Sequence, residues 1–181
     1  MTTDAVDDGS LQVHGSLMVG YAQACVNLNI VAGRGAMDFI SRLDVNAWYP
    51  LARWKQLEQL VMQSYKNVDP IMVKVGIQMM AGWYHFGPGK SVLRGGASFL
   101  HFQTGNGGFQ SVVRGPASEV GSFELDQFDR RAGKAAIYST TPFNRKMECG
   151  VLIGGILAPG DISYVDVVND THPDLLVVEF H

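Results

Sequence analysis

The most constraining feature of this 181-residue sequence is a change of hydrophobic period near Gly105. Before this point, apolar residues recur at steps of three or four, which is the spacing of helices that bury one face. After it, short segments alternate polar and apolar residues, as half-buried strands do. Helices followed by strands predict an α+β domain in which N-terminal helices pack on a twisted antiparallel sheet.

The first half contains five predicted helices. Pro50 suits the first turn of one of them, because its missing N–H costs nothing there. Asp69-Pro70 opens the next in the same way. The predicted helices span residues 16–28, 35–43, 51–65, 69 to 84–87, and 91–102.

The second half contains the predicted strands and one further helix among them. Arg131-Ala132-Gly133 is a plausible hairpin tip. Asn144 should cap the helix at 144–157, and Pro159-Gly160 should stop it. The predicted strands span residues 109–114, 122–128, 134–138, 162–168 and 175–180.

The length favours one domain with a full core rather than two domains. Residues 1–10 are small and polar and are predicted to be a disordered tail, so residues 11–181 form the domain. Leu11 to His14 is either a short strand or a docking segment. Only 17% of the residues are charged, which is low for a free monomer, so we expect a homodimer.

Charge and cysteine content exclude several classes of protein. The formal net charge is −3 and no basic cluster is long enough to bind nucleic acid. No signal-peptide pattern or apolar run of membrane-spanning length is present. Two cysteines give no disulfide framework. We therefore expect a cytoplasmic protein with reduced thiols, no membrane span and no nucleic-acid partner.

The stretch "HFGPGKSV", residues 85–92, resembles the end of a phosphate-binding loop. That loop requires a glycine five positions before Gly89, where Tyr84 stands instead. The preceding residues also have a helical pattern and not that of a strand. The better interpretation is a helix stop, with Ser91 capping the next helix.

No combination of residues suggests a catalytic site, so we lean against an enzyme. His14, His85 and His101 are scattered, and His101 lies in an apolar setting that suits either a haem ligand or a core histidine. Cys149 follows two basic residues early in its helix, so it is either a reactive thiol or a small buried hydrophobe.

Methionine and aromatic residues concentrate on the third and fourth predicted helices. Methionine adapts to irregular apolar shapes, so this composition suits either an apolar ligand pocket between helices and sheet or an ordinary filled core. The bare face made by Gly150 and Gly154 allows close packing on the sheet or on a neighbouring chain. The candidate ligand-binding residues are Trp54, Tyr65, Met79, Trp83, His101 and Cys149.

Several segments together resemble a known superfamily. They are "VHGSLMVGYAQACVNLN", "GRGAMDFISRL", "WYPLARWKQLEQLV" and "MECGVLIGGILA". In spacing and hydrophobic character they resemble four-vinyl-reductase-like domains and a mainly myxobacterial family of single-domain proteins. These share an architecture with haem nitric-oxide-binding domains and TRAPP subunits. The resemblance implies helices on an antiparallel sheet, dimers formed through those helices, and a sensory or interaction role.

The resemblance also bears on cofactors. Some relatives carry a zinc cluster whose first cysteine would correspond to Cys149, but Val167 or Val168 and Leu175 stand where later thiolates would fall. The haem branch carries Tyr-x-Ser-x-Arg, whereas the nearest stretch here is Tyr49 to Arg53, with leucine in place of serine. We therefore expect no cofactor, with haem as a distant alternative.

These observations predict a non-enzymatic domain that binds an apolar or aromatic small molecule and acts as a sensor, as a homodimer. The alternative is an interaction or scaffold module without a ligand. A haem-based gas sensor using His101, His85 or His14 is the third possibility.

Overall fold

The computed structural model describes residues 10–169 and 171–181. The predicted disordered tail, apart from Ser10, lies outside the described residues. The helices are α1 (Gly15–Asn27), α2 (Gly33–Ile40), α3 (Leu51–Met62), α4 (Asp69–Phe86), α5 (Gly89–Val92), α6 (Gly96–Thr104), α7 (Ala117–Val120), α8 (Arg145–Leu157) and the 3-10 helix η1 (Phe109–Ser111). The strands are β1 (Gln12–His14), β2 (Trp48–Pro50), β3 (Val113–Arg114), β4 (Phe123–Asp129), β5 (Lys134–Ser139), β6 (Val165–Val168) and β7 (Leu175–Phe180).

The strands form two antiparallel sheets. The main sheet has the order β4-β5-β7-β6, and its β4–β5 hairpin turns at Gly133, which has a φ of 64°. The small sheet has the order β2-β1-β3. These sheets and the helices that cover them confirm the α+β class.

The small sheet was only partly anticipated. β1 shows that residues 12–14 are a strand, whereas β2 was not predicted at all. Residues 109–114 are not one strand, because η1 and the two residues of β3 divide them. Such short strands depend on pairing with distant segments, and their own sequences carry little signal of it.

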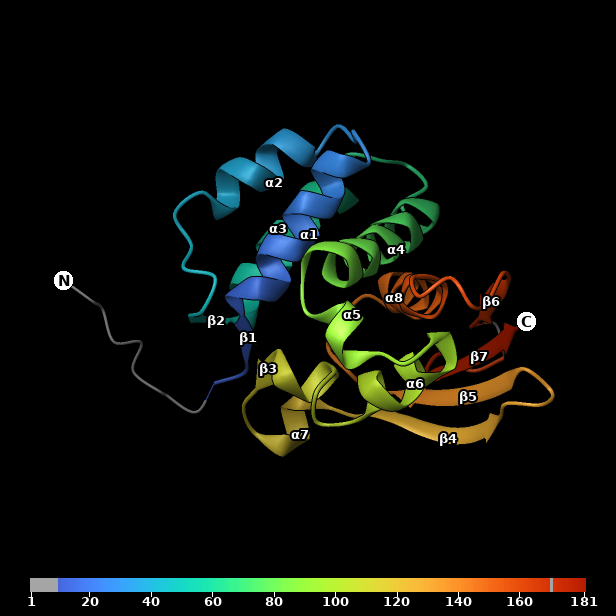
Figure 1. Cartoon of the computed structure of the whole chain (residues 1–181). Coiled ribbons are helices and arrows are strands. Elements are labelled where there is room, and N and C mark those ends of the chain that lie inside the picture. Colours follow the sequence, from blue (N-terminus) through green and yellow to red (C-terminus); the bar gives the residue numbers. More distant parts are fainter. Residues whose placement is uncertain (1–9, 170) are drawn as a thin grey trace.

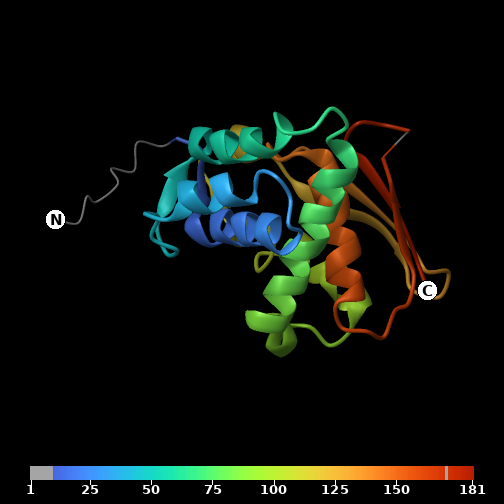
Figure 2. The same ribbon diagram turned by 90° about the horizontal axis from the view of Figure 1, so that it is seen from above.

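The helices lie in layers on one side of the main sheet (Figures 1 and 2). α8 contacts the sheet directly, α4 packs against α8, and α1 packs against α4. The helix nearest the sheet therefore comes from the C-terminal half of the sequence. Of the N-terminal helices, α6 also contacts the sheet, at β4, whereas α1 and α4 lie in the outer layers.

α4 and α8 approach closely because glycines face each other. A Cβ atom on Gly150 would collide with the carbonyl oxygen of Val73, and one on Gly154 would lie 2.6 Å from the carbonyl oxygen of Ile77. Gly76 on α4 faces the backbone of α8 in the same way. The bare face of α8 thus packs on α4, and not on the sheet or a neighbouring chain as expected from the sequence.

The predicted helix stops are mostly correct. Asn144 caps α8, since its Oδ1 accepts hydrogen bonds from the backbone N–H groups of Lys146 (2.9 Å) and Met147 (3.1 Å). The "HFGPGKSV" stretch does end α4. Ser91, however, lies inside α5, where its hydroxyl donates to the carbonyl of Pro88. The predicted helix at 91–102 is divided into two, because Val92 ends α5 and α6 begins at Gly96.

In the described part of the chain, every helix falls short of the combined length and apolar character that crossing a membrane requires.

Candidate functional site

An apolar cavity of about 110 Å³ lies where α1, α4, α6, α8 and the segment around η1 meet. Met79, Met80 and Trp83 line it from α4, and Met147 and Val151 line it from α8. We call it the Trp83 cavity. It is the candidate site because its walls come from segments far apart in the sequence and are mostly apolar.

Aromatic rings that pack against one another form part of the wall of the Trp83 cavity. The ring of Trp83 stacks on that of Phe102, with centroids 5.0 Å apart and planes 29° apart. The ring of Phe109 meets that of Phe143 edge-to-face at 5.9 Å. These geometries are favourable for aromatic pairs and hold the rings in defined positions.

A glycine-rich loop, residues 105–108, packs against the ring of Phe102. Gly107 and Gly108 both line the cavity. A Cβ on Gly107 would lie 2.9 Å from the ring of Phe102, and one on Gly108 would collide with the backbone of Gln103. The loop therefore requires glycine for its close approach to α6, and its backbone forms part of the cavity wall.

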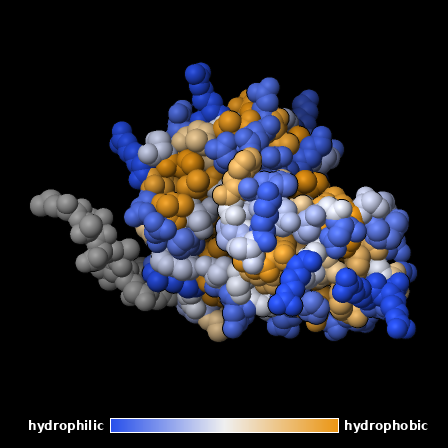
Figure 3. Space-filling view, in the orientation of Figure 1, coloured by the Kyte–Doolittle hydropathy of each residue, from blue (hydrophilic) through white to orange (hydrophobic). Residues whose placement is uncertain are grey.

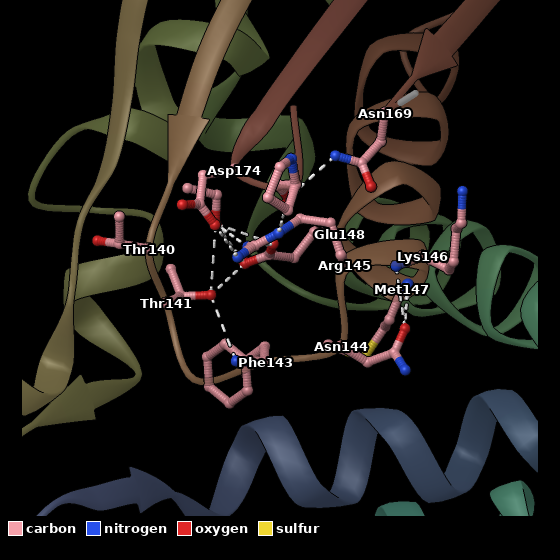
Figure 4. Close-up of polar contacts among 12 residues, drawn as sticks. Thr140, Thr141, Phe143, Asn144, Arg145, Lys146, Met147, Glu148, Asn169 and Asp174 are labelled. Carbon is pink, nitrogen blue, oxygen red and sulfur yellow. Dashed lines mark hydrogen bonds and ion pairs between the residues drawn. The ribbon is translucent and has the colours of Figure 1, made fainter. Parts of the chain in front are cut away.

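One ionisable side chain, Glu148, lines the Trp83 cavity. It is buried, and Figure 4 shows its carboxylate held by side chains from two elements. The hydroxyl of Ser139 donates to it at 2.9 Å, and Thr141 and Arg145 also donate to it. Burial raises the pKa of Glu148, and the Arg145 guanidinium and the two hydroxyl groups only partly oppose this effect.

Arg145 links this carboxylate to the segment before β7. Its Nε donates to the carbonyl of Pro173 at 3.1 Å, and its Nη2 lies 3.4 Å from Asp174. The Asn169 side chain donates to the carbonyls of Pro173 and Leu175, at 3.1 and 3.0 Å. The network joins the cavity wall to the start of α8, the end of β5 and the β6–β7 connection (Figure 4).

This network was not predicted from the sequence. The available signal was a glutamate within the apolar run "MECGVLIGGIL", three residues after an arginine. A charged pair at this spacing on a helix with few exposed residues indicates a buried ion pair, but its partners on β5 and before β7 could not be assigned.

The six predicted ligand-binding residues do not lie together in the structure. Met79 and Trp83 line the cavity. Trp54 is completely buried, with its ring between those of Tyr21 (5.0 Å) and Phe143 (5.2 Å). The hydroxyl of Tyr65 accepts a hydrogen bond from the backbone N–H of Val31 at 2.9 Å. Trp54 and Tyr65 thus hold the helices together outside the cavity.

His101 and Cys149 also lie outside the Trp83 cavity. His101 is exposed on α6, and its ring meets that of Phe128 at 4.8 Å. Cys149 is buried in α8, and burial raises the pKa of its thiol to about 11. Burial likewise raises the pKa of Cys25 to about 12. A thiol with such a pKa carries little thiolate at neutral pH, so burial favours the interpretation of Cys149 as a small buried hydrophobe.

The residues of the cavity do not fit a haem group. None of the three candidate histidines, His14, His85 and His101, lines it, and neither does any lysine or arginine that could pair with the propionates. The volume is also well below the roughly 300–1,000 Å³ of ordinary ligand pockets. Across residues 10–169 and 171–181, no three histidine, cysteine or carboxylate side chains are grouped so as to hold a metal ion.

Neither a protein-family model nor a curated protein sequence matches this chain. Solved structures do match it. A protein studied for haem redox potential and porphyrin distortion aligns with a TM-score of 0.66 and 14% identity, over 92% of this chain and 94% of that one. A single-residue variant of the Tt H-NOX domain gives 0.65 and 13% over the same shares.

A third structure is an oxygen-binding H-NOX domain related to soluble guanylate cyclases. It aligns with a TM-score of 0.62 and 12% identity, over 92% of this chain and 94% of that one. At these identities the likeness establishes the architecture alone. The chain therefore has the fold of the haem nitric-oxide-binding H-NOX domains.

Proposed function

We propose that this chain is a non-enzymatic sensory domain that binds a small apolar molecule in the Trp83 cavity. The observation that carries the proposal is an apolar cavity with defined aromatic walls at the junction of four helices. Of the six residues expected from the sequence, Met79 and Trp83 belong to the proposed site. Phe102, Phe109 and Val151 complete it.

The size of the cavity limits the ligand class. An apolar cavity of about 150 Å³ engineered into another protein binds benzene or xenon. At about 110 Å³, the Trp83 cavity suits a ligand of at most one aromatic ring. An apolar guest needs no polar partner there, and Glu148 already receives hydrogen bonds from Ser139, Thr141 and Arg145.

The network around Glu148 offers a route from ligand to signal. A ligand shifts an equilibrium only if it binds one state better than another. A guest that displaced Glu148 would strain the hydrogen bonds through Arg145 to Pro173 and Asp174. We propose that occupancy of the cavity is transmitted to the β6–β7 connection in this way.

A homodimer and a cytoplasmic location remain part of the proposal. Figure 3 shows apolar patches over the helical half of the molecule. Val31 is 80% exposed, and Val26 and Val45 are about two-fifths exposed. A dimer formed through the helices, as the four-vinyl-reductase resemblance implies, would cover such residues. Sedimentation equilibrium of the purified chain tests the dimer.

Haem is a second candidate because the fold is that of H-NOX domains. The lining of the Trp83 cavity argues against it, so we expect added haem to bind weakly and without a fixed stoichiometry. Titration of the purified protein with haem, followed by absorption in the Soret region, distinguishes a haem sensor from a sensor of a small apolar molecule. A sharp band that saturates at one haem per chain would favour the haem sensor instead.

The direct test is a thermal-shift titration with benzene and toluene. By mass action, a ligand at about 100 times its Kd adds about 2.7 kcal/mol to the free energy of unfolding. For a chain of this size, that raises Tm by roughly 5–10 °C. Val151→Phe, which fills the cavity, should abolish the shift, whereas Val151→Ala should retain it. No shift in the wild-type chain, with no extra mass in native mass spectrometry, would favour the scaffold alternative.

A further inference from the structure

The outward face of the main sheet carries three ordered rows of side chains. Strand register places Glu124, Tyr138 and Leu175 in the first row. The second row is Gln127, Ala136, Val177 and Val168, and the third is Asp129, Lys134, Glu179 and Asp166. The helices that contact the sheet lie on its other side, so no element of the described chain covers these rows (Figure 2).

The centre of this outward face is apolar. Tyr138, Val177 and Val168 are 41%, 40% and 39% exposed, and they extend across three neighbouring strands. Single exposed hydrophobic residues are ordinary, but a continuous exposed patch marks an interaction surface. A shallow groove of about 430 Å³ runs along Ala136, Tyr138 and Val177.

The margin of the face is acidic. Glu124, Asp126, Asp129, Asp166 and Glu179 surround the apolar centre, and Lys134 is the only basic residue among these rows. Lys134 lies 3.5 Å from Glu179. Asp166 stands directly opposite Glu179 on the neighbouring strand, an arrangement that is destabilising for like charges. Lys134 offsets part of this repulsion, and a further positive charge from another molecule would reduce it more.

We propose that this face binds a basic amphipathic helix of a partner protein. The apolar side of the helix would lie in the groove, and its lysines or arginines would face the acidic margin. A helix is one of the elements that cover a sheet face in folded domains. A second copy of this chain fits poorly, because two such faces would bring the same acidic margins together. The N-terminal residues 1–9 fit poorly too, because they carry three aspartates and no basic residue.

The test uses two synthetic helical peptides of about 18 residues, roughly five turns, one built from leucine and lysine and the other from leucine and glutamate. Fluorescence anisotropy at low salt should detect binding of the lysine peptide alone. The variant Asp166→Lys/Glu179→Lys should weaken that binding by about tenfold or more. Rising salt should weaken it in the wild-type chain as well.

The matched control is Asp38→Lys/Glu119→Lys, which changes the net charge equally at exposed sites away from the sheet. It should leave the affinity for the lysine peptide nearly unchanged. Equal loss in the two double variants, or equal binding of the two peptides, would overturn the proposal. So would a wild-type dimer that the sheet variant dissociates, because a second copy would then occupy the face.

Discussion

Trp54 and Trp83 occupy similar positions in the sequence and different environments in the structure. Each lies on the apolar stripe of a helix, and each was expected to contact a ligand. Trp54 is fully buried, whereas Trp83 is partly exposed and lines a cavity. We call the surroundings of Trp54 the closed core, in contrast to the Trp83 cavity.

The difference comes from the segments that reach each ring. Tyr21 and Phe143 arrive from distant parts of the chain and pack edge-on against Trp54. The loop that lines the Trp83 cavity brings Gly107 and Gly108, which contribute backbone but no side chain to its wall. The apolar stripe thus identifies the face that a helix buries. The segments that reach this face decide whether other side chains pack closely against it or leave a cavity.

The largest contrast should appear when each tryptophan is removed. Trp54→Ala leaves a large void in a fully packed region and should lower the free energy of unfolding by about 3–5 kcal/mol. Trp83→Ala enlarges an existing cavity at a partly exposed site and should cost about 1–2 kcal/mol. Urea denaturation of both variants measures the difference. Equal losses would mean that the two regions are packed alike.

Removing the cation beside Glu148 should have the next largest effect. Arg145→Ala leaves a buried carboxylate without its ion-pair partner, which typically costs about 3 kcal/mol or more. Arg145→Ala/Glu148→Gln should recover part of that loss, because the charge is removed as well. Denaturant titration of the single and double variants measures their free energies of unfolding. A double variant that is less stable than the single one would contradict a buried, paired carboxylate.

Substitution of two helix glycines, Gly150 on α8 and Gly82 on α4, should change the stability by smaller amounts of opposite sign. Gly150→Ala places a methyl group against the backbone of α4 and should cost about 1–3 kcal/mol. Gly82→Ala, at a position with no atom within 4 Å, should add about 0.5–1 kcal/mol through helix propensity. Tm measurements compare them. A stabilising Gly150→Ala would show that α4 and α8 are less closely packed than described.

The raised pKa of Glu148 makes a prediction about pH. A carboxyl whose pKa is higher in the folded state contributes stability at pH values below its unfolded pKa, and that contribution is lost as pH rises through the folded pKa. The wild-type chain should therefore lose stability relative to Glu148→Gln as pH rises from mildly acidic to neutral. Unfolding free energies of both proteins across this range measure the difference. A difference that grows in favour of the wild type would indicate a lowered pKa.

The smallest effect should be seen in the reactivity of the two cysteine thiols. Cys25 and Cys149 are buried, and burial raises the pKa of both thiols. Both should react with a thiol reagent at neutral pH only about as fast as the chain opens. Quantitative labelling in the native state and in urea checks this. Rapid native labelling of Cys149 alone would show that the surroundings of Cys149 on α8 open to solvent without global unfolding.

Features that depend on local sequence were predictable. The Asn144 cap, the turn at Gly133 and the stop after Phe86 follow from residues adjacent in the chain. The strand β2 and the Glu148 network were not, because pairing and burial there depend on residues from segments far apart in the sequence. For the same reason, the sequence could not show that Trp54 lies in the closed core and Trp83 lines the cavity.

The most direct test of the central claim is fluorine NMR of the chain with its three tryptophans replaced by 5-fluorotryptophan. Toluene should shift the resonance of Trp83 in a saturable way and leave those of Trp48 and Trp54 in place. Single tryptophan-to-phenylalanine variants assign the three signals. A saturable shift at Trp54 with Trp83 unmoved would contradict the account, because the ligand would then enter the closed core.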